Sequence, residues 1–226
     1  FTGFAEGEDP QWVMSVLNRY LAIMADAVFA WGGTLCKYTG DGIMALFGAP
    51  VPQPDHALKA LRAADELRRR CQALASRMAA ESALPRQEPG KPGWATTAGE
   101  PGSHRVGPWD LAVGIGVASG EAVVGNVGSP RRVDYTAIGD VVNVAARLEG
   151  EAGPWEILMT RHTAEAAAVG RRGRQWLKAL LEEAQPEVLQ VVGRQTPLFI
   201  YRLTGNSRRD DQETVMPLTE NRHGQP

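Results

Sequence analysis

The stretch Lys37-Tyr-Thr-Gly-Asp-Gly-Ile-Met-Ala-Leu-Phe-Gly48 is the most informative part of this chain. Two apolar runs flank Thr-Gly-Asp-Gly, which has the composition of a turn. We therefore predict strands over 34–38 and 43–47, joined as a β-hairpin. The turn should expose one carboxylate, that of Asp41, and carboxylate oxygens are ligands that Mg²⁺ prefers. An aspartate beside glycine is also common in ordinary turns, so the turn alone does not establish a metal site.

A second informative stretch is Asp134-Tyr-Thr-Ala-Ile-Gly-Asp-Val-Val-Asn-Val-Ala-Ala-Arg-Leu-Glu149. Its pattern predicts a strand that runs into a helix. Asn143 and Arg147 stand four residues apart, so both side chains should lie on one face of that helix. An exposed Asn–Arg pair suits a phosphate or a sugar. A surface ion pair of Arg147 with Asp140 or Glu151 is the structural alternative.

Helices and strands are predicted in alternation along the rest of the chain. Asp9-Pro10 is a good helix start, because aspartate caps the first turn and proline fits its first position. Gly32-Gly33 ends that helix, and Asp55 begins a second, long helix with one apolar face. The other predicted elements are strands over 111–117 and 122–127, which we expect to pair, strands over 133–137 and 157–160, helices over 139–149 and from Thr163, and a hairpin of strands 188–192 and 198–203.

This order of elements indicates an α+β fold, in which helices pack on one sheet. Prolines and glycines without periodicity mark about 81–109 as a flexible insertion. The polar stretch 204–226 is expected to be a tail or linker. We therefore expect one domain over 1–203, interrupted by the insertion.

Composition excludes several classes of protein. The net charge of −2 over 226 residues argues against a nucleic-acid-binding surface. Cys36 and Cys71 are too few for a disulfide framework, so we expect reduced thiols and a cytoplasmic domain. We expect no apolar run that approaches the roughly 20 residues of a membrane span, and no signal peptide. Because the chain begins inside a motif, we expect it to be part of a longer protein, and a membrane anchor ahead of Phe1 stays open.

Together, the two stretches resemble the catalytic domain of the class III nucleotidyl cyclases, the adenylyl and guanylyl cyclases, and in particular a bacterial branch called class IIIb. The resemblance covers roughly 1–80 and 110–203, and it implies a ferredoxin-like βαββαβ core, a palm-like fold, with extra C-terminal strands and with the first strand truncated. Its further motifs are Phe1-Thr-Gly-Phe-Ala-Glu6, Gly114-Ile-Gly-Val-Ala-Ser-Gly120, Gly125-Asn-Val-Gly-Ser129 and Val192-Gly-Arg-Gln-Thr-Pro-Leu-Phe-Ile-Tyr-Arg-Leu203.

The resemblance implies that ATP is converted to cyclic AMP and pyrophosphate by attack of the ribose 3′-hydroxyl on the α-phosphate, with two Mg²⁺ or Mn²⁺ ions. Asp41 matches the second of the family's two metal-binding aspartates. The first lies in the motif Asp-Ile-x-Gly-Phe-Thr, of which this chain holds only Phe1 and Thr2, so the activity of this fragment stays open. Phe1 and Thr2 match the loop that wraps the triphosphate.

Five further residues match functional positions of the family. Lys37 and Thr136 match the pair that reads the purine, with lysine donating to adenine N1 and the hydroxyl accepting from the adenine amino group. Guanylyl cyclases usually carry glutamate at the lysine position, so ATP is favoured over GTP. Asn143 and Arg147 match the pair that orients the ribose and stabilises phosphate charge. Arg194 matches a lysine that reaches the β- and γ-phosphates.

In the family, the metal aspartates and the base-reading lysine of one site come from different subunits. The resemblance therefore implies a head-to-tail homodimer with shared active sites, regulated by fused sensory or membrane-anchoring domains. Two alternatives stay open: a guanylate cyclase, and a catalytically inactive cyclase-homology module that binds nucleotide or dimerises. A cyclic-dinucleotide synthase is disfavoured, because its Gly-Gly-[Asp/Glu]-Glu-Phe signature is absent.

Overall fold

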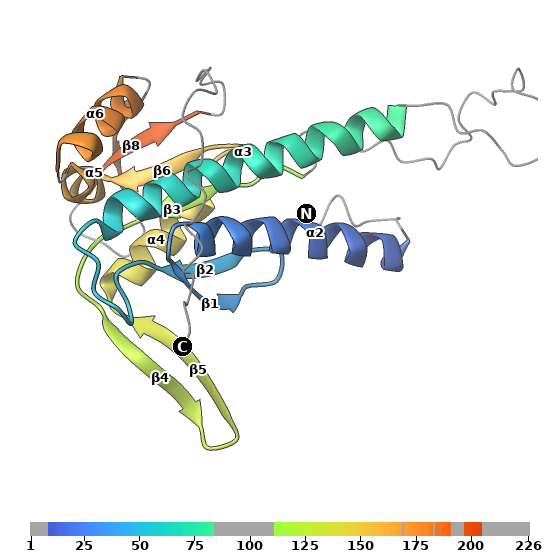
Figure 1. The fold of residues 1–226 in the computed structure, drawn as a ribbon, viewed down its shortest axis with the longest axis horizontal. Coiled ribbons are helices and arrows are strands. Elements are labelled where there is room, and N and C mark those ends of the chain that lie inside the picture. Colours follow the sequence, from blue (N-terminus) through green and yellow to red (C-terminus); the bar gives the residue numbers. More distant parts are fainter. Residues whose placement is uncertain (1–8, 84–110, 169, 183, 191–196, 205–226) are drawn as a thin grey trace, which may run out of the picture.

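The structure is a computed structural model, and it describes residues 9–83, 111–168, 170–182, 184–190 and 197–204. Helices and strands alternate along the chain, which confirms the α+β class (Figure 1). In chain order, the elements are α2 (Pro10–Ala30), β1 (Thr34–Tyr38), β2 (Ile43–Leu46), α3 (His56–Ala83), β3 (Ile115–Val117), β4 (Val123–Ser129), β5 (Arg132–Ile138), α4 (Asp140–Glu151), β6 (Ile157–Thr160), α5 (Arg161–Ala167), α6 (Gly170–Leu181), β7 (Gln185–Leu189) and β8 (Leu198–Leu203).

The described strands form three sheets rather than the single sheet that we expected. The largest has the strand order β3-β6-β8-β7, and β1–β2 and β4–β5 are separate antiparallel hairpins. The predicted pairing of 111–117 with 122–127 is wrong. β3 pairs in parallel with β6, while β4 pairs with β5. The short loop between β3 and β4 suggested a hairpin, but the chain reaches β6 through α4, and such a helical crossover is the usual connection between parallel strands.

Helices cover both faces of the four-stranded sheet. On one face, α4 packs through Val144 and Leu148 against Leu158 of β6 and Ile200 of β8. On the opposite face, α3, α5 and α6 form a second apolar cluster with β6 and β8. α2 lies beside α3 and contacts the β1–β2 hairpin. The sheet therefore holds α4 on the side away from the other helices.

α2 begins as the sequence predicts, since the Asp9 side chain accepts a hydrogen bond from the Trp12 backbone N–H at 2.9 Å. One expectation about this helix is wrong. Within the part of the chain that the structure describes, α2 alone is long and apolar enough to cross a membrane by length and composition. Its residues Val16, Tyr20 and Met24 are buried in the core, and 33% of its apolar window is buried, so packing in the core accounts for part of its apolar character.

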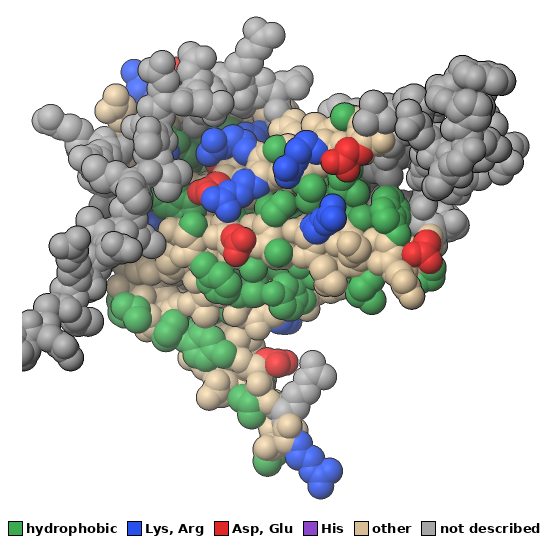
Figure 2. All heavy atoms as spheres, turned by 45° about the vertical axis from the view of Figure 1, so that its right-hand side comes forward, with side chains coloured by type: hydrophobic (Ala, Val, Ile, Leu, Met, Phe, Trp, Pro, Cys, Tyr) green, Lys and Arg blue, Asp and Glu red, His purple; other side chains and the backbone are tan. Residues whose placement is uncertain are grey.

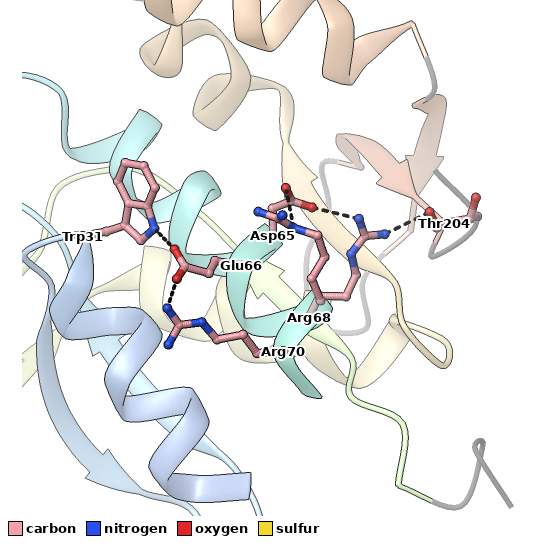
Figure 3. A network of polar contacts seen from close by, with 7 residues as sticks. Trp31, Asp65, Glu66, Arg68, Arg70 and Thr204 are labelled. Atoms are coloured by element: carbon pink, nitrogen blue, oxygen red, sulfur yellow. Dashed lines mark hydrogen bonds and ion pairs between the residues drawn. The ribbon is translucent and has the colours of Figure 1, made fainter. Parts of the chain in front are cut away.

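A polar network fastens α3 to its neighbours (Figure 3). Arg68 is only 5% exposed. It donates one hydrogen bond to the Thr204 carbonyl at 3.0 Å and another to the Asp65 carboxylate at 2.8 Å. Glu66 follows Asp65 in α3, and its carboxylate accepts a hydrogen bond from the Trp31 indole N–H at 2.6 Å. The network thus joins α3 to the end of β8 and to the C-terminal end of α2.

Two boundaries of the predicted domain fall at the edge of the described residues. α3 ends at Ala83, so the helix extends a little into the range expected for the insertion. The remaining range 84–110 and the tail 205–226 lie outside the described residues. The insertion, the tail and the domain limits therefore stay predictions.

The C-terminal part of the fold differs in detail from the prediction. α6 was not predicted, because its many basic residues and two glycines obscure the helical pattern. The strand predicted over 188–192 begins earlier, at Gln185, and includes Pro186. Proline fits here because β7 is an edge strand, where a missing N–H is tolerated.

Candidate functional site

The β1–β2 hairpin presents Asp41 at its turn, as the sequence predicts. The Thr39 backbone N–H donates to the Gly42 carbonyl at 2.9 Å and closes the loop. Gly40 has a φ of 83°, a left-handed conformation that glycine adopts without strain. The Asp41 side chain is exposed, and it forms no ion pair within the described residues. One free carboxylate is therefore held at a defined turn.

Lys37 lies directly after a β-bulge in β1. Leu35 pairs with Ala45 and Lys37 pairs with Met44, so Cys36 has no partner residue in the ladder. A bulge re-aims the side chains that follow it, and Lys37 therefore lies on the opposite face of the hairpin from Leu35. Burial raises the pKa of the Cys36 thiol, and the adjacent Lys37 ammonium opposes this rise. No sequence signal predicted the bulge.

Thr136 lies on β5, opposite Gly125 of β4, and is half-buried. β5 contacts β1, the strand that carries Lys37. The two residues that were matched to base recognition therefore come from two strands that lie against each other, although these strands belong to different hairpins.

Asn143 and Arg147 lie on the exposed face of α4, while Val144 and Leu148 are buried against the sheet. The prediction that both polar side chains share one helix face is confirmed. Among the residues that the structure describes, Arg147 forms no ion pair, so the alternative of a surface ion pair is not observed. α4 thus offers an amide and a guanidinium, one turn apart, to solvent.

Three of the predicted site residues fall in parts of the chain that the structure does not describe. Phe1, Thr2 and Arg194 lie outside the described residues. No hydrogen bond or ion pair among the described residues joins Asp41 to Asn143 or Arg147. Among the described residues, Asp41 thus lies at the β1–β2 turn, Lys37 and Thr136 lie on β1 and β5, and Asn143 and Arg147 lie on α4.

The donor set was compared with the needs of a divalent cation. In the described segments, no group of three or more His, Cys, Asp or Glu side chains could hold a metal ion by itself. Asp41 supplies one carboxylate. Mg²⁺ often keeps several waters and is held by one or two carboxylates together with substrate phosphates, so Asp41 fits as one protein ligand of such an ion.

The β4–β5 hairpin extends from the body as an arm with apolar side chains along it (Figures 1 and 2). Val123 and Ile138 face each other across the hairpin and are 77% and 60% exposed. Val127 and Val133 are exposed as well. By register, Val123, Val127 and Ile138 lie on one face of the hairpin and Val133 lies on the other. Both faces of the arm therefore expose apolar side chains, which is typical of an interaction site.

A sheet with α4 on one face, an acidic hairpin turn and an exposed Asn–Arg pair are features of a nucleotide-handling domain. The chain matches the model of the family described as "Adenylate and Guanylate cyclase catalytic domain" over residues 1–188. It therefore belongs to this family of nucleotidyl cyclases, and the resemblance seen in the sequence is confirmed.

Individual relatives are bacterial cyclases. Adenylate cyclase 1 of Rhizobium meliloti (strain 1021) is 31% identical over 205 residues, which are 91% of this chain and 26% of that protein. Adenylate cyclase of Anabaena cylindrica is 34% identical over 150 residues, which are 66% of this chain and 25% of that protein. The chain therefore spans about a quarter of the length of these curated relatives.

Solved structures of the family have the same fold. The guanylyl cyclase Cya2 is 30% identical, with a TM-score of 0.67 over 91% of this chain and 86% of that one. The adenylyl cyclase CyaB from P. aeruginosa is 27% identical, with a TM-score of 0.68 over 92% and 90% of the two chains. One of these two structures is a guanylyl cyclase and the other an adenylyl cyclase, so structural similarity alone does not distinguish ATP from GTP as the substrate.

Proposed function

We propose that this domain is an adenylate cyclase, which converts ATP to cyclic AMP and pyrophosphate. The observation that carries the proposal is that Lys37 and Thr136 come from the contacting strands β1 and β5. A lysine ammonium only donates hydrogen bonds, which suits the acceptor N1 of adenine, and a threonine hydroxyl can accept from the adenine amino group. Guanine presents donors at N1 and at its amino group, and lysine cannot accept from them.

The exposed face of α4 provides the groups for the reacting part of ATP. Asn143 orients the ribose, so that its 3′-hydroxyl faces the α-phosphate. Arg147 offers a planar guanidinium that stabilises charge on the phosphates as pyrophosphate leaves. Asp41 would be one ligand of the divalent cations, which would favour ionisation of the hydroxyl and neutralise phosphate charge.

We infer that the working unit is a homodimer with shared sites. Among the described residues of one chain, no hydrogen bond or ion pair joins Asp41 to Asn143 or Arg147. The β4–β5 arm also exposes Val123 and Ile138. Burial of the arm against a second copy would remove this apolar surface from water and bring Asp41 of one subunit to α4 of the other. Fused sensory or membrane-anchoring segments would regulate a cytoplasmic catalytic unit of this kind.

A turnover assay tests the proposal. A chain that includes the family's Asp-Ile-x-Gly segment ahead of Phe1 is given ATP or GTP with Mg²⁺ or Mn²⁺, and the cyclic product is identified. We expect cyclic AMP, and its loss in Asp41→Ala. Cyclic GMP as the main product would favour the guanylate cyclase. No product from a folded, dimeric, nucleotide-binding protein would favour the inactive module.

The similarity to Cya2 gives the guanylate cyclase alternative its specific support. A paired substitution discriminates between the two base preferences. Lys37→Glu with Thr136→Ala should reduce use of ATP and raise use of GTP, because glutamate accepts from the guanine donors. If the paired substitution leaves the ratio of the two products unchanged, these residues do not read the base.

Complementation tests the shared sites. Asp41→Ala and Arg147→Ala each change an exposed side chain, so both variants should fold. Random pairing of equal amounts leaves one working site in half of the dimers, or about a quarter of the wild-type activity. Failure to complement, with both variants folded and dimeric, would count against sites that are shared between subunits.

A further inference from the structure

β3 makes an unusually close contact with the helix that carries Asn143 and Arg147. A Cβ atom added at Gly116 would lie 2.2 Å from the Ala145 carbonyl oxygen and 2.4 Å from the Glu149 backbone nitrogen. Real Cβ atoms essentially never approach heavy atoms within 3.0 Å. Because both obstacles are backbone atoms, no change of rotamer relieves the contact, and the backbones of β3 and α4 would have to move apart by about 1 Å.

The contact falls on the turn of α4 that carries Arg147. The Ala145 carbonyl and the Glu149 N–H are four residues apart, so they are the partners of one helical hydrogen bond. Gly116 thus lies directly beneath the hydrogen bond that spans Arg147. Leu148 is fully buried in the same turn, and it fixes the rotation of the helix, while Gly116 fixes its depth.

A second glycine, directly before β3, makes a looser contact with the same helix. A Cβ at Gly114 would lie 3.0 Å from the Ala152 carbonyl oxygen, near the end of α4. At Gly120, the nearest atom, on Val141, would be at an ordinary 3.4 Å. The steric demand for glycine is therefore strongest at Gly116.

We propose that Gly116 is a positioning residue for the cyclase reaction, which sets the depth of α4 on the sheet and thereby the position of Arg147 and Asn143. This inference rests on the proposed function. A displacement of about 1 Å in a group that stabilises the transition state can cost about 100-fold in rate. Lys37 and Thr136 are on other strands, so the grip on the base is unchanged.

Steady-state kinetics of Gly116→Ala test this role. We expect kcat to fall by about 100-fold, with KM for ATP within about threefold of wild type. Gly150→Ala is the matched control, because the same atom is added on α4 itself, where nothing lies within 4 Å. Its kcat should equal that of wild type. A wild-type kcat in Gly116→Ala would overturn the proposal.

Complementation separates a displaced α4 from a general loss of folding. Gly116→Ala should restore activity when it is mixed with Asp41→Ala, since it still supplies a working Asp41, and should fail with Arg147→Ala. Rescue by neither partner would show a general defect and overturn the positioning role. If Gly116→Ala does not fold, Gly114→Ala takes its place. We then expect a smaller fall in kcat and the same complementation pattern. A wild-type kcat in Gly114→Ala would overturn the proposal.

Amide hydrogen exchange keeps this test independent of the reaction. In Gly116→Ala, the amides around Glu149 should exchange faster than in wild type, and in Gly150→Ala they should not. Unchanged amide exchange at α4 would refute the proposal that Gly116 sets the depth of this helix on the sheet. Absence of product from the wild-type protein would instead refute the proposed function, and the exchange data would still decide whether Gly116 sets the depth of α4.

Discussion

Replacing Arg68 by methionine tests the buried ion pair that fastens α3 to the end of β8. The Arg68 guanidinium donates to the Asp65 carboxylate and to the Thr204 carbonyl, and it is almost completely buried. Methionine keeps a long apolar side chain of similar reach but removes the charge and both hydrogen bonds. The substitution therefore isolates the polar contribution from the packing of the stem.

The cost of this substitution depends on what remains around Asp65. Removing one partner of a buried ion pair costs about 3–5 kcal/mol, because the other charge is left uncompensated. Two features reduce that cost: Arg69 approaches Asp65 at 3.5 Å, and the Nε of Arg68 is already buried without a partner. We therefore expect the free energy of unfolding to fall by about 3 kcal/mol, at the low end of this range.

Urea unfolding of three variants measures this energy. Arg69→Met is the matched control, because Arg69 pairs with the same carboxylate from a side chain that is 57% exposed, and such a pair contributes less than about 1 kcal/mol. Arg68→Met combined with Asp65→Leu should recover most of the loss, since no buried charge remains. A loss below about 1 kcal/mol in Arg68→Met would refute the reasoning.

Three further predictions concern the core and the contacts of α3. Leu148→Ala should lower the free energy of unfolding by about 2–5 kcal/mol in urea titrations, because Leu148 is fully buried; a smaller loss would mean that the site collapses around the cavity. Trp31→Phe removes the indole N–H that donates to Glu66 and should cost about 1–3 kcal/mol, whereas in a Glu66→Gln background the cost should be smaller. Burial raises the pKa of the Cys71 thiol to about 12. Because the thiol of the unfolded chain ionises at lower pH, the stability that this shift contributes is complete below pH 9 and is lost as the pH rises towards 12. The thermal midpoint should therefore fall more steeply over that pH range in wild type than in Cys71→Ala.

Local signals predicted much of the fold. The Asp9 cap, the turn around Gly40 and the helix that places Asn143 and Arg147 on one face depend on neighbours in sequence, and each is found as predicted. Strand pairing was predicted less well. The stretches 111–117 and 122–127 were expected to pair. The real partner of β3 is β6, and this pairing depends on long-range packing that a single sequence does not display.

The candidate site was predictable in its residue types but not in its supports. The bulge at Cys36 adds one residue to a strand without any change in composition. The close contact at Gly116 is only weakly indicated by the sequence, since glycine inside a strand often marks a close backbone approach. What the glycine approaches could not be known until α4 was placed over β3. Backbone-to-backbone distances of this kind belong to the tertiary structure, and no local pattern reports them.

The junction between the β4–β5 arm and α4 has a mechanical consequence. β5 ends at Ile138 and α4 begins at Asp140, so a single residue, Gly139, separates them. That residue is itself packed, since an added Cβ would lie 3.0 Å from the Glu121 carbonyl oxygen. The arm and the helix are therefore connected through one short, packed junction. In the proposed homodimer, the orientation of a second subunit on the arm would therefore influence the position of α4 and of Arg147.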